Sequence, residues 1–311
     1  MIQKLRERGT REIALDFEGE SNLHMYGLHL CLVQIFDGEH CYLVDPLGLE
    51  DPRDVALITE NVEILKVMYD PASDLSLLAN ALGIKVKNIF DLSTAAQILG
   101  FRETSLAKVL SAELSVEPVN KKKFQRANWC RRPLDPELLA YAASDVLHLL
   151  ELKRVFLRRL MERELLTEFM VQNFKIQDRD YRLDPAERYL RIKNAGRLKP
   201  TQLVYLKHFF AARDVLARRL NWPPHNVLAN ETLIEIARHP PRSPSSWLEL
   251  GRRKGKTVEL AGFTEAQKAA EKELAGRGSE PAVADRRGGE HRRGGMSQRD
   301  RRRRGRRPRS G

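Results

Sequence analysis

Two carboxylates lie two positions apart in the strand-like segment ALDFE, where Asp16 and Glu18 flank Phe17. Side chains two apart in a strand share a face, so the two acids are expected to point one way and Phe17 the other. Paired carboxylates repel each other, and burying them without a partner is costly. Binding of Mg²⁺ or Mn²⁺ is one compensation, because these cations prefer hard oxygen ligands. An edge strand with both acids in water is the alternative.

Further acidic residues have spacings that suit the same chemistry. Tyr141 and Asp145 stand at i and i+4 in YAASD, on one face of a predicted helix that is otherwise apolar around Asp145. Asp74 stands at the start of the predicted helix ASDLSLL, where a lone acid also suits the helix dipole. Asp70, four residues earlier, competes for the role of Asp74. The sequence therefore offers several candidate cation ligands and a phenol that can orient a water.

The elements expected to position these residues begin with three strands joined by short connections, which predicts antiparallel pairing. Strand–helix alternation follows, and this order indicates an α/β domain with a mixed sheet. Asp91 is expected to cap a helix rather than to bind a metal. The predicted strands are 11–17, 28–36, 40–45, 63–69 and 86–91, and the predicted helices of this part are 51–60, 72–82, 93–100 and 105–114.

Helices dominate the rest of the chain. One long amphipathic helix is predicted over 135–166, with Asp135 as N-cap and a proline at the first helical position. Residues 167–182 are predicted to be a connector. Four helices over about 183–251, the first in DPAERYLRIKNAG, predict a small all-helical unit. One short helix, FTEAQKAAEKELAG, is predicted beyond it.

Positive charge is concentrated at the C-terminal end. Residues 252–311 contain 19 Lys and Arg against 8 Asp and Glu, so they carry +11 of the net charge of +12. Residues 285–311 hold 12 Arg and almost no apolar side chain, and this composition predicts disorder. A flexible Arg-rich tail suits electrostatic tethering to phosphates, with a strong salt dependence. A tail that only improves solubility is the alternative.

Cysteine usage and hydropathy indicate the compartment. The three cysteines include no C-x-x-C pair, so neither a disulfide framework nor a zinc site is predicted, and Cys31 and Cys41 are expected to be buried packing residues. No apolar stretch reaches the roughly 18–20 residues that span a membrane. The charged N-terminus is unlike a secretory signal. We therefore expect a soluble, cytoplasmic protein.

The ordered set of motifs resembles the DEDD-type 3′–5′ exonucleases of the tyrosine branch, and specifically the ribonuclease D family. The resemblance rests on D-x-E in a first strand, an Asp at a D-L-x-x-L helix start and Y-x-x-x-D on a late helix. It extends to QRANWCRRPLDPELLAYAASDVLHLL, and residues 198–241 are similar to an HRDC domain. The resemblance covers about residues 12–250. It implies a ribonuclease-H-like exonuclease domain at 1–166, a connector at 167–182, an HRDC-like domain at 183–251 and a basic, largely disordered tail at 252–311.

The resemblance also implies roles for the candidate residues. Asp16 and Glu18 become metal ligands of the first motif, Asp74 the carboxylate of the second, and Asp145 the last ligand. Tyr141 becomes the side chain that orients the attacking water. Two divalent cations, Mg²⁺ or Mn²⁺, about 3.5–4 Å apart would activate water, neutralise charge and help the 3′-oxygen leave. Asp16 is expected to bridge them.

Three positions depart from the family pattern. Gly19 stands where the family usually has an aromatic or aliphatic residue, Tyr69 stands where a His often opens the second motif, and Leu92 follows Asp91 where the family commonly has Asp-Thr. These departures bear on the geometry of the pocket for the 3′-terminal nucleotide.

A basic segment, NKKKFQRANWCRRPL, precedes the last motif. Its Lys and Arg side chains are candidates for phosphate contacts, and its aromatic residues are candidates for stacking on unpaired bases. Packing under the following helix is the alternative for Trp129. The expected nucleic-acid contacts are Lys121, Lys122, Lys123 and Arg126.

These features predict a metal-dependent 3′–5′ exoribonuclease that trims structured RNA such as tRNA precursors. The choice of RNA rests on the resemblance, because no residue here reads a 2′-hydroxyl. A noncatalytic RNA-binding module on an exonuclease-like scaffold is one alternative, and a DNA 3′–5′ exonuclease is another.

Overall fold

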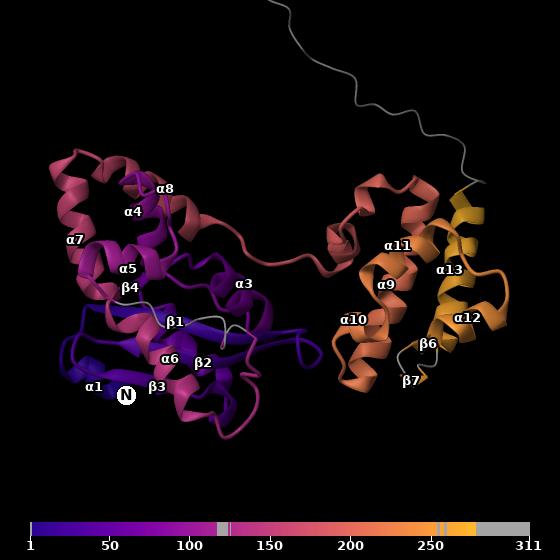
Figure 1. Cartoon of the computed structure of the whole chain (residues 1–311), viewed down its shortest axis with the longest axis horizontal. Helices are drawn as coiled ribbons and strands as arrows, with labels where there is room; N and C mark the ends of the chain where they lie inside the picture. The colour runs from indigo at the N-terminus through magenta and orange to yellow at the C-terminus, as the bar shows by residue number, and fades with distance from the viewer. Residues whose placement is uncertain (1, 117–123, 125, 254–255, 258–259, 278–311) are drawn as a thin grey trace, which may run out of the picture.

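The chain folds into an α/β unit followed by a helical unit, with an extended segment after residue 178 (Figure 1). The computed structural model describes residues 2–116, 124, 126–253, 256–257 and 260–277. None of the helices in these described ranges is both long and apolar enough to cross a bilayer.

A five-stranded sheet in the order β3-β2-β1-β4-β5 forms the centre of the first unit. β1 pairs antiparallel with β2 and β2 with β3, whereas β1–β4 and β4–β5 are parallel. The mixed sheet and its antiparallel start are therefore confirmed. The strands are β1 (Glu12–Ser21), β2 (Leu28–Phe36), β3 (Cys41–Val44), β4 (Leu65–Met68) and β5 (Ile89–Asp91).

Helices cover both faces of the sheet. Alternate residues of β1 divide between two cores: Leu15 and Phe17 pack with α3, and Ala14 packs with α4, α5 and α7. Asp16 and Glu18 alternate with Leu15 and Phe17, so they share the face of Ala14. The helices of this unit are α1 (Ile2–Glu7), α2 (Ala56–Thr59), α3 (Ala72–Ala81), α4 (Leu92–Ile98), α5 (Leu106–Leu114), α6 (Pro136–Leu147), α7 (Leu149–Glu162) and α8 (Leu166–Asp178), with 3₁₀ turns at Pro46–Gly48 and Pro52–Val55.

The long helix predicted over 135–166 is two helices, because the chain bends at His148 between α6 and α7. The two helices cover different parts of the sheet. α6 contacts β1, β2 and β3, whereas α7 contacts β1, β4, α4 and α5 (Figure 1). One straight helix cannot follow both parts of a twisted sheet, so the break comes from tertiary packing.

The segment predicted as a connector at 167–182 is mostly helical, because α8 occupies most of it. Phe169 is fully buried, and its ring lies 4.5 Å from that of Phe90. Asn173 accepts from the backbone N–H of Asp91 at 2.8 Å and donates to the carbonyl of Ile89 at 2.7 Å. α8 therefore covers the free edge of β5 and satisfies its backbone groups.

The helical unit has a core rich in aromatic residues. Residues 185–191, predicted to be helical, form a 3₁₀ turn instead. The helix predicted beyond residue 251 spans 17 residues and packs on α9, with Phe263 fully buried. The elements are 3₁₀ turns at Pro185–Arg191 and Ala195–Arg197, α9 (Pro200–Leu220), α10 (Pro224–Val227), α11 (Asn230–Arg238), α12 (Pro244–Gly251), the short strands β6 (Arg252–Arg253) and β7 (Lys256–Thr257), and α13 (Ala261–Arg277).

Lys66 is a buried cation in the middle of β4, and replacing it is expected to stabilise the protein. Its side chain has no exposed surface, its ammonium donates to the carbonyl of Asn61, and burial together with Lys87 lowers its pKa from 10.5 to about 8. The unfolded chain binds this proton more tightly, so the charged lysine destabilises the fold at every pH below about 8. Lys66→Met should therefore raise the free energy of unfolding by about 2 kcal/mol at pH 7.

Urea unfolding over a range of pH measures this effect. The advantage of Lys66→Met should shrink between pH 8 and 10.5, because the folded wild type then loses its proton before the unfolded chain does. A variant advantage that stays constant over that range would show that the charge of Lys66 does not oppose folding.

Candidate active site

Three carboxylates from β1 and α6 converge beside the sheet. One oxygen each of Asp16, Glu18 and Asp145 lies within 4.8 Å of the others. Asp145 is buried, and the other two are partly buried. The strand alternation places Asp16 and Glu18 on the face that α6 covers, so their convergence with Asp145 follows from the packing of α6 on β1.

A β-bulge lies directly after Glu18. The register with β2 shifts between Glu18 and Gly19, and such a shift bends a strand and redirects its side chains. A Cβ at Gly19 would overlap the end of the Leu77 side chain and lie 3.1 Å from the carbonyl oxygen of His29. The glycine that departs from the family pattern thus lies where α3 and β2 come close, and a larger residue there would have to displace the Leu77 side chain.

Tyr141 lies one helical turn before Asp145 and is buried. Burial raises the pKa of its phenol, and the nearby charges of Asp145 and Glu18 raise it further. The phenol hydrogen-bonds to Asp145, which also raises its pKa. The ring of Phe124 stacks on it at 4.9 Å. Tyr141 is therefore a neutral donor held in a fixed orientation beside the carboxylates.

Asp74 lies in the first turn of α3, outside the group of three. Burial raises the pKa of its carboxyl well above the ordinary value, and the charges of Asp16, Glu18 and Asp70 follow in that order. Asp74 is thus close enough to Asp16 and Glu18 for their charges to raise its pKa. The competing residue, Asp70, is exposed and lines the same cavity as the three carboxylates.

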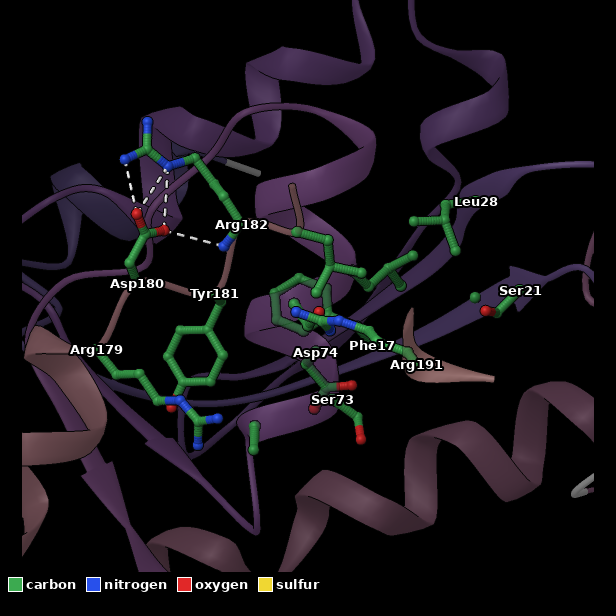
Figure 2. Close-up of a pocket in the computed structure, with 15 residues that line it drawn as sticks. Phe17, Ser21, Leu28, Ser73, Asp74, Arg179, Asp180, Tyr181, Arg182 and Arg191 are labelled. Atoms are coloured by element: carbon green, nitrogen blue, oxygen red, sulfur yellow. Dashed lines mark hydrogen bonds and ion pairs between the residues drawn. The ribbon is translucent and has the colours of Figure 1, made fainter. Parts of the chain in front are cut away.

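Two cavities meet at this site. One of about 330 Å³ is lined by the three carboxylates together with Tyr69 and Tyr141. The other, of about 630 Å³, holds Asp74 (Figure 2). Phe17 lines both cavities, so the D-x-E strand lies between them.

Sequence reasoning missed the cationic wall of the larger cavity. Arg179, Tyr181 and Arg191 line it, and all three come from the chain that follows α8 (Figure 2). The ring of Tyr181 lies 5.3 Å from the guanidinium of Arg179. The local signal was weak, because Arg179 and Arg182 alternate with acidic residues after Asp178, a pattern equally typical of an exposed connector.

Asp91 has the capping role that the sequence predicted. It is buried and starts α4, where it accepts from the backbone N–H groups of Ser93 and Thr94. It also accepts from the backbone N–H of Asp70 at 3.0 Å, which joins the two chain segments next to the cavity. The Tyr69 hydroxyl donates to the carbonyl of Thr104 nearby.

The described part of the basic segment is fastened to the sheet by Arg132, which sequence reasoning did not select. Its guanidinium forms two 2.6 Å contacts with Asp45 and donates to the carbonyl of Cys31 at 2.7 Å. Trp129 is buried, so it packs under α6 rather than offering a stacking surface. Arg126 is exposed, and Lys121, Lys122 and Lys123 lie outside the described residues.

Cys31 is fully buried, as the sequence predicted. Cys41, which was also expected to be buried, is only partly buried. The Cys31 and Cys130 sulfur atoms lie 3.1 Å apart, a contact that adds to the attachment of the basic segment to β2.

The donor set suits hard divalent cations. Carboxylate oxygens within one small cavity are the ligands that Mg²⁺ and Mn²⁺ prefer, and a cation would relieve the mutual repulsion of the acids. The residues present therefore fit such ions. The arrangement can bind cations, hold a water beside Tyr141 and accept a polyanionic chain end through the cavity.

Comparison with known proteins gives consistent matches. A 3′–5′ exonuclease family model matches residues 1–161, and an HRDC domain model matches residues 202–261. Ribonuclease D of Haemophilus influenzae is 30% identical over 247 residues, which cover 77% of this chain and 60% of that protein. Ribonuclease D of Zymomonas mobilis is 31% identical over 229 residues, 72% of this chain and 58% of that protein. The chain spans about three-fifths of the length of these relatives.

Solved structures agree with the sequence matches. The crystal structure of Escherichia coli RNase D, an exoribonuclease involved in structured RNA processing, superposes with a TM-score of 0.70 at 26% identity, over 91% of this chain and 74% of that one. The catalytic core of RRP6 from Trypanosoma brucei gives a TM-score of 0.68 at 25% identity, over 89% and 79%. The resemblance to ribonuclease D and the ribonuclease-D-like fold with an HRDC domain are thus confirmed. Because the exonuclease model covers more than half of its residues, the chain belongs to the 3′–5′ exonuclease family and carries an HRDC domain.

Proposed function

We propose that this protein is a 3′–5′ exoribonuclease that hydrolyses RNA from its 3′ end with two divalent cations, Mg²⁺ or Mn²⁺. The observation that carries the proposal is the convergence of Asp16, Glu18 and Asp145 in one cavity, beside Tyr141, within a chain of this family. Ribonuclease D relatives support RNA as the substrate. Precursors of tRNA or other structured RNAs in the cytoplasm are the proposed physiological substrates.

The chain's residues have distinct proposed roles. Asp16, Glu18 and Asp145 would hold the cations. When bound, two such ions supply an activated water, neutralise the phosphate and stabilise the leaving 3′-oxygen. Tyr141 stays neutral because its pKa is raised, so it orients the water by hydrogen bonding and does not act as a base.

Asp74 is the proposed fourth ligand, with Asp70 as the competitor. The charges of Asp16 and Glu18 affect the Asp74 carboxyl more strongly than that of Asp70 does, which supports its closeness to the cluster. Burial is the largest cause of the raised pKa of Asp74, and the like charges add to it. A cation bound nearby would lower this pKa, because it favours the carboxylate form.

RNA contacts outside the site are proposed for the basic segment and the tail. Lys121, Lys122, Lys123 and Arg126 would meet phosphates, and the Arg-rich tail would act as a salt-dependent tether. The exonuclease domain is proposed at 1–166 and the HRDC-like domain at 183–251, with the packing of α13 on α9 favouring an extension of the latter to residue 277.

A matched pair of substrates tests the proposal. An RNA and a DNA of the same sequence, each with a single-stranded 3′ extension and a 5′ label, are incubated with Mg²⁺, Mn²⁺ or a chelator. The proposal predicts one-nucleotide shortening of the RNA that the chelator abolishes. Faster shortening of the DNA would favour a DNA exonuclease, and tight RNA binding without shortening would favour a noncatalytic module.

Tyr141→Phe is expected to lower the single-turnover rate of shortening about 100-fold, the size of effect that follows when a reacting group is misplaced. The dissociation constant for RNA should stay unchanged, because the ring and its packing on Phe124 remain. Tyr42→Phe on β3, whose hydroxyl bonds Asp37 away from the cavity, is the control and should keep the full rate. An unchanged rate for Tyr141→Phe would remove the phenol from the mechanism.

A further inference from the structure

One buried polar side chain next to the carboxylates has no partner. Gln34 lies in the middle of β2 with no exposed surface, and neither its amide oxygen nor its amide nitrogen makes a hydrogen bond. The strand around it, LHLCLVQIF, is apolar on both sides of this position. A buried amide without a partner costs about 1–3 kcal/mol, so stability alone would favour an apolar residue here.

The register places Gln34 directly beside Asp16. The two residues are opposite each other in the antiparallel pair β1–β2, before the bulge at Glu18–Gly19. Opposite residues point to the same face with Cβ atoms about 4.5–5.5 Å apart, a gap that a glutamine side chain spans. On its other flank Gln34 pairs with Leu43 of β3, which offers only an apolar side chain.

The same face carries the other parts of the site. α6 packs over β1, β2 and β3, and it brings Tyr141 and Asp145 onto the face that holds Asp16 and Gln34. Gln34 thus lies opposite Asp16 in the sheet, on strands that α6 covers. An amide N–H is a donor, and a carboxylate is an acceptor with several lone pairs.

We propose that Gln34 is a positioning residue for Asp16: its amide donates to the Asp16 carboxylate and fixes the orientation in which that carboxylate binds divalent cations. The amide does not make this bond in the structure, so the bond would form through a change in the conformation of the Gln34 side chain. Residues that orient a ligand in this way change metal affinity about 10–100-fold when they are replaced. The inference rests on the proposed function, because it assumes that Asp16 is a cation ligand.

Titration of the full chain with Mn²⁺ alone tests the inference, with binding heat as the readout and thermal melts without added cation as the second readout. Gln34→Met keeps the size of the side chain and removes the donor. We expect its dissociation constant for Mn²⁺ to rise about 10–100-fold, while its melting temperature without cation stays equal to or above that of the wild type. Gln34→Leu should behave the same way.

Leu43→Met is the matched control, because it alters the opposite flank of Gln34 and should leave Mn²⁺ affinity unchanged. Wild-type affinity in Gln34→Met would overturn the inference and leave the proposed function standing. A lower melting temperature for both Gln34 variants without cation would also overturn it, since the amide would then be a structural partner. A wild type that binds no Mn²⁺ would overturn the proposed function and the inference together.

Discussion

Asp16→Asn is expected to lower the rate of RNA shortening by on the order of 10³-fold, because metal ions contribute several kcal/mol of transition-state stabilisation and each 1.36 kcal/mol is tenfold in rate. Asparagine keeps the shape of the side chain and removes the anionic oxygen. The cluster then loses one of its three carboxylates, the one that pairs with Gln34 of β2. Single-turnover shortening of a 5′-labelled RNA at saturating Mg²⁺ measures the effect.

Two comparisons separate lost catalysis from lost folding. Removing one of three neighbouring carboxylates relieves repulsion, so the melting temperature of Asp16→Asn without cation should not fall. Asp54→Asn, at an exposed position outside the cluster, should keep the wild-type rate. If Asp16→Asn retained more than a tenth of the wild-type rate, the cation-binding role of Asp16 would be contradicted.

Phe263→Ala is expected to unfold the helical unit while the sheet of the first unit stays intact. Phe263 is fully buried, and its ring lies 5.7 Å from that of Trp247 and 6.2 Å from that of Phe209. Truncating a buried phenylalanine costs about 3–5 kcal/mol, and the lost ring pairs add about 0.5–1.5 kcal/mol. A unit of this size has little more stability than that to lose.

Hydrogen exchange of the full chain measures the result for each unit separately. Amides of α9 and α11 should lose protection in Phe263→Ala, and amides of β1 and β2 should keep it. Lys268→Ala is the control on the same helix, because its ion pair with Glu265 is exposed to solvent and adds little to stability. Full protection of α9 in Phe263→Ala would mean that the helical unit ends near residue 251 after all.

The first three strands were predictable because their signals are local. Apolar runs, alternation and the turn between β2 and β3 depend only on neighbouring residues. The break at His148 and the role of α8 were not predictable, since they depend on sheet twist and on the contacts of Asn173 with β5. The contribution of α13 to the core of the helical unit was not predicted, because Phe263 lies within residues 252–311, whose overall composition is basic.

Parts of the candidate site were likewise predictable from local spacing, and other parts depend on long-range packing. Period-two spacing placed Asp16 and Glu18 on one face, and the i, i+4 spacing joined Tyr141 to Asp145. Their meeting in space required α6 to pack on β1, which only the family resemblance suggested. The close approach of Leu77 in α3 to Gly19 is a long-range contact that the sequence does not reveal. The position of Gln34 in an apolar strand was visible in the sequence but was not recognised.

The most direct test of the central claim, catalysis through divalent cations held by Asp16, Glu18 and Asp145, replaces one non-bridging oxygen at the 3′-terminal linkage of the RNA with sulfur. Mg²⁺ prefers hard oxygen ligands and binds sulfur poorly, whereas Mn²⁺ accepts it better. We predict that one phosphorothioate diastereomer is shortened far more slowly than the all-oxygen RNA in Mg²⁺ and regains much of its rate in Mn²⁺. Equal slowing in both metals for both diastereomers would contradict the claim.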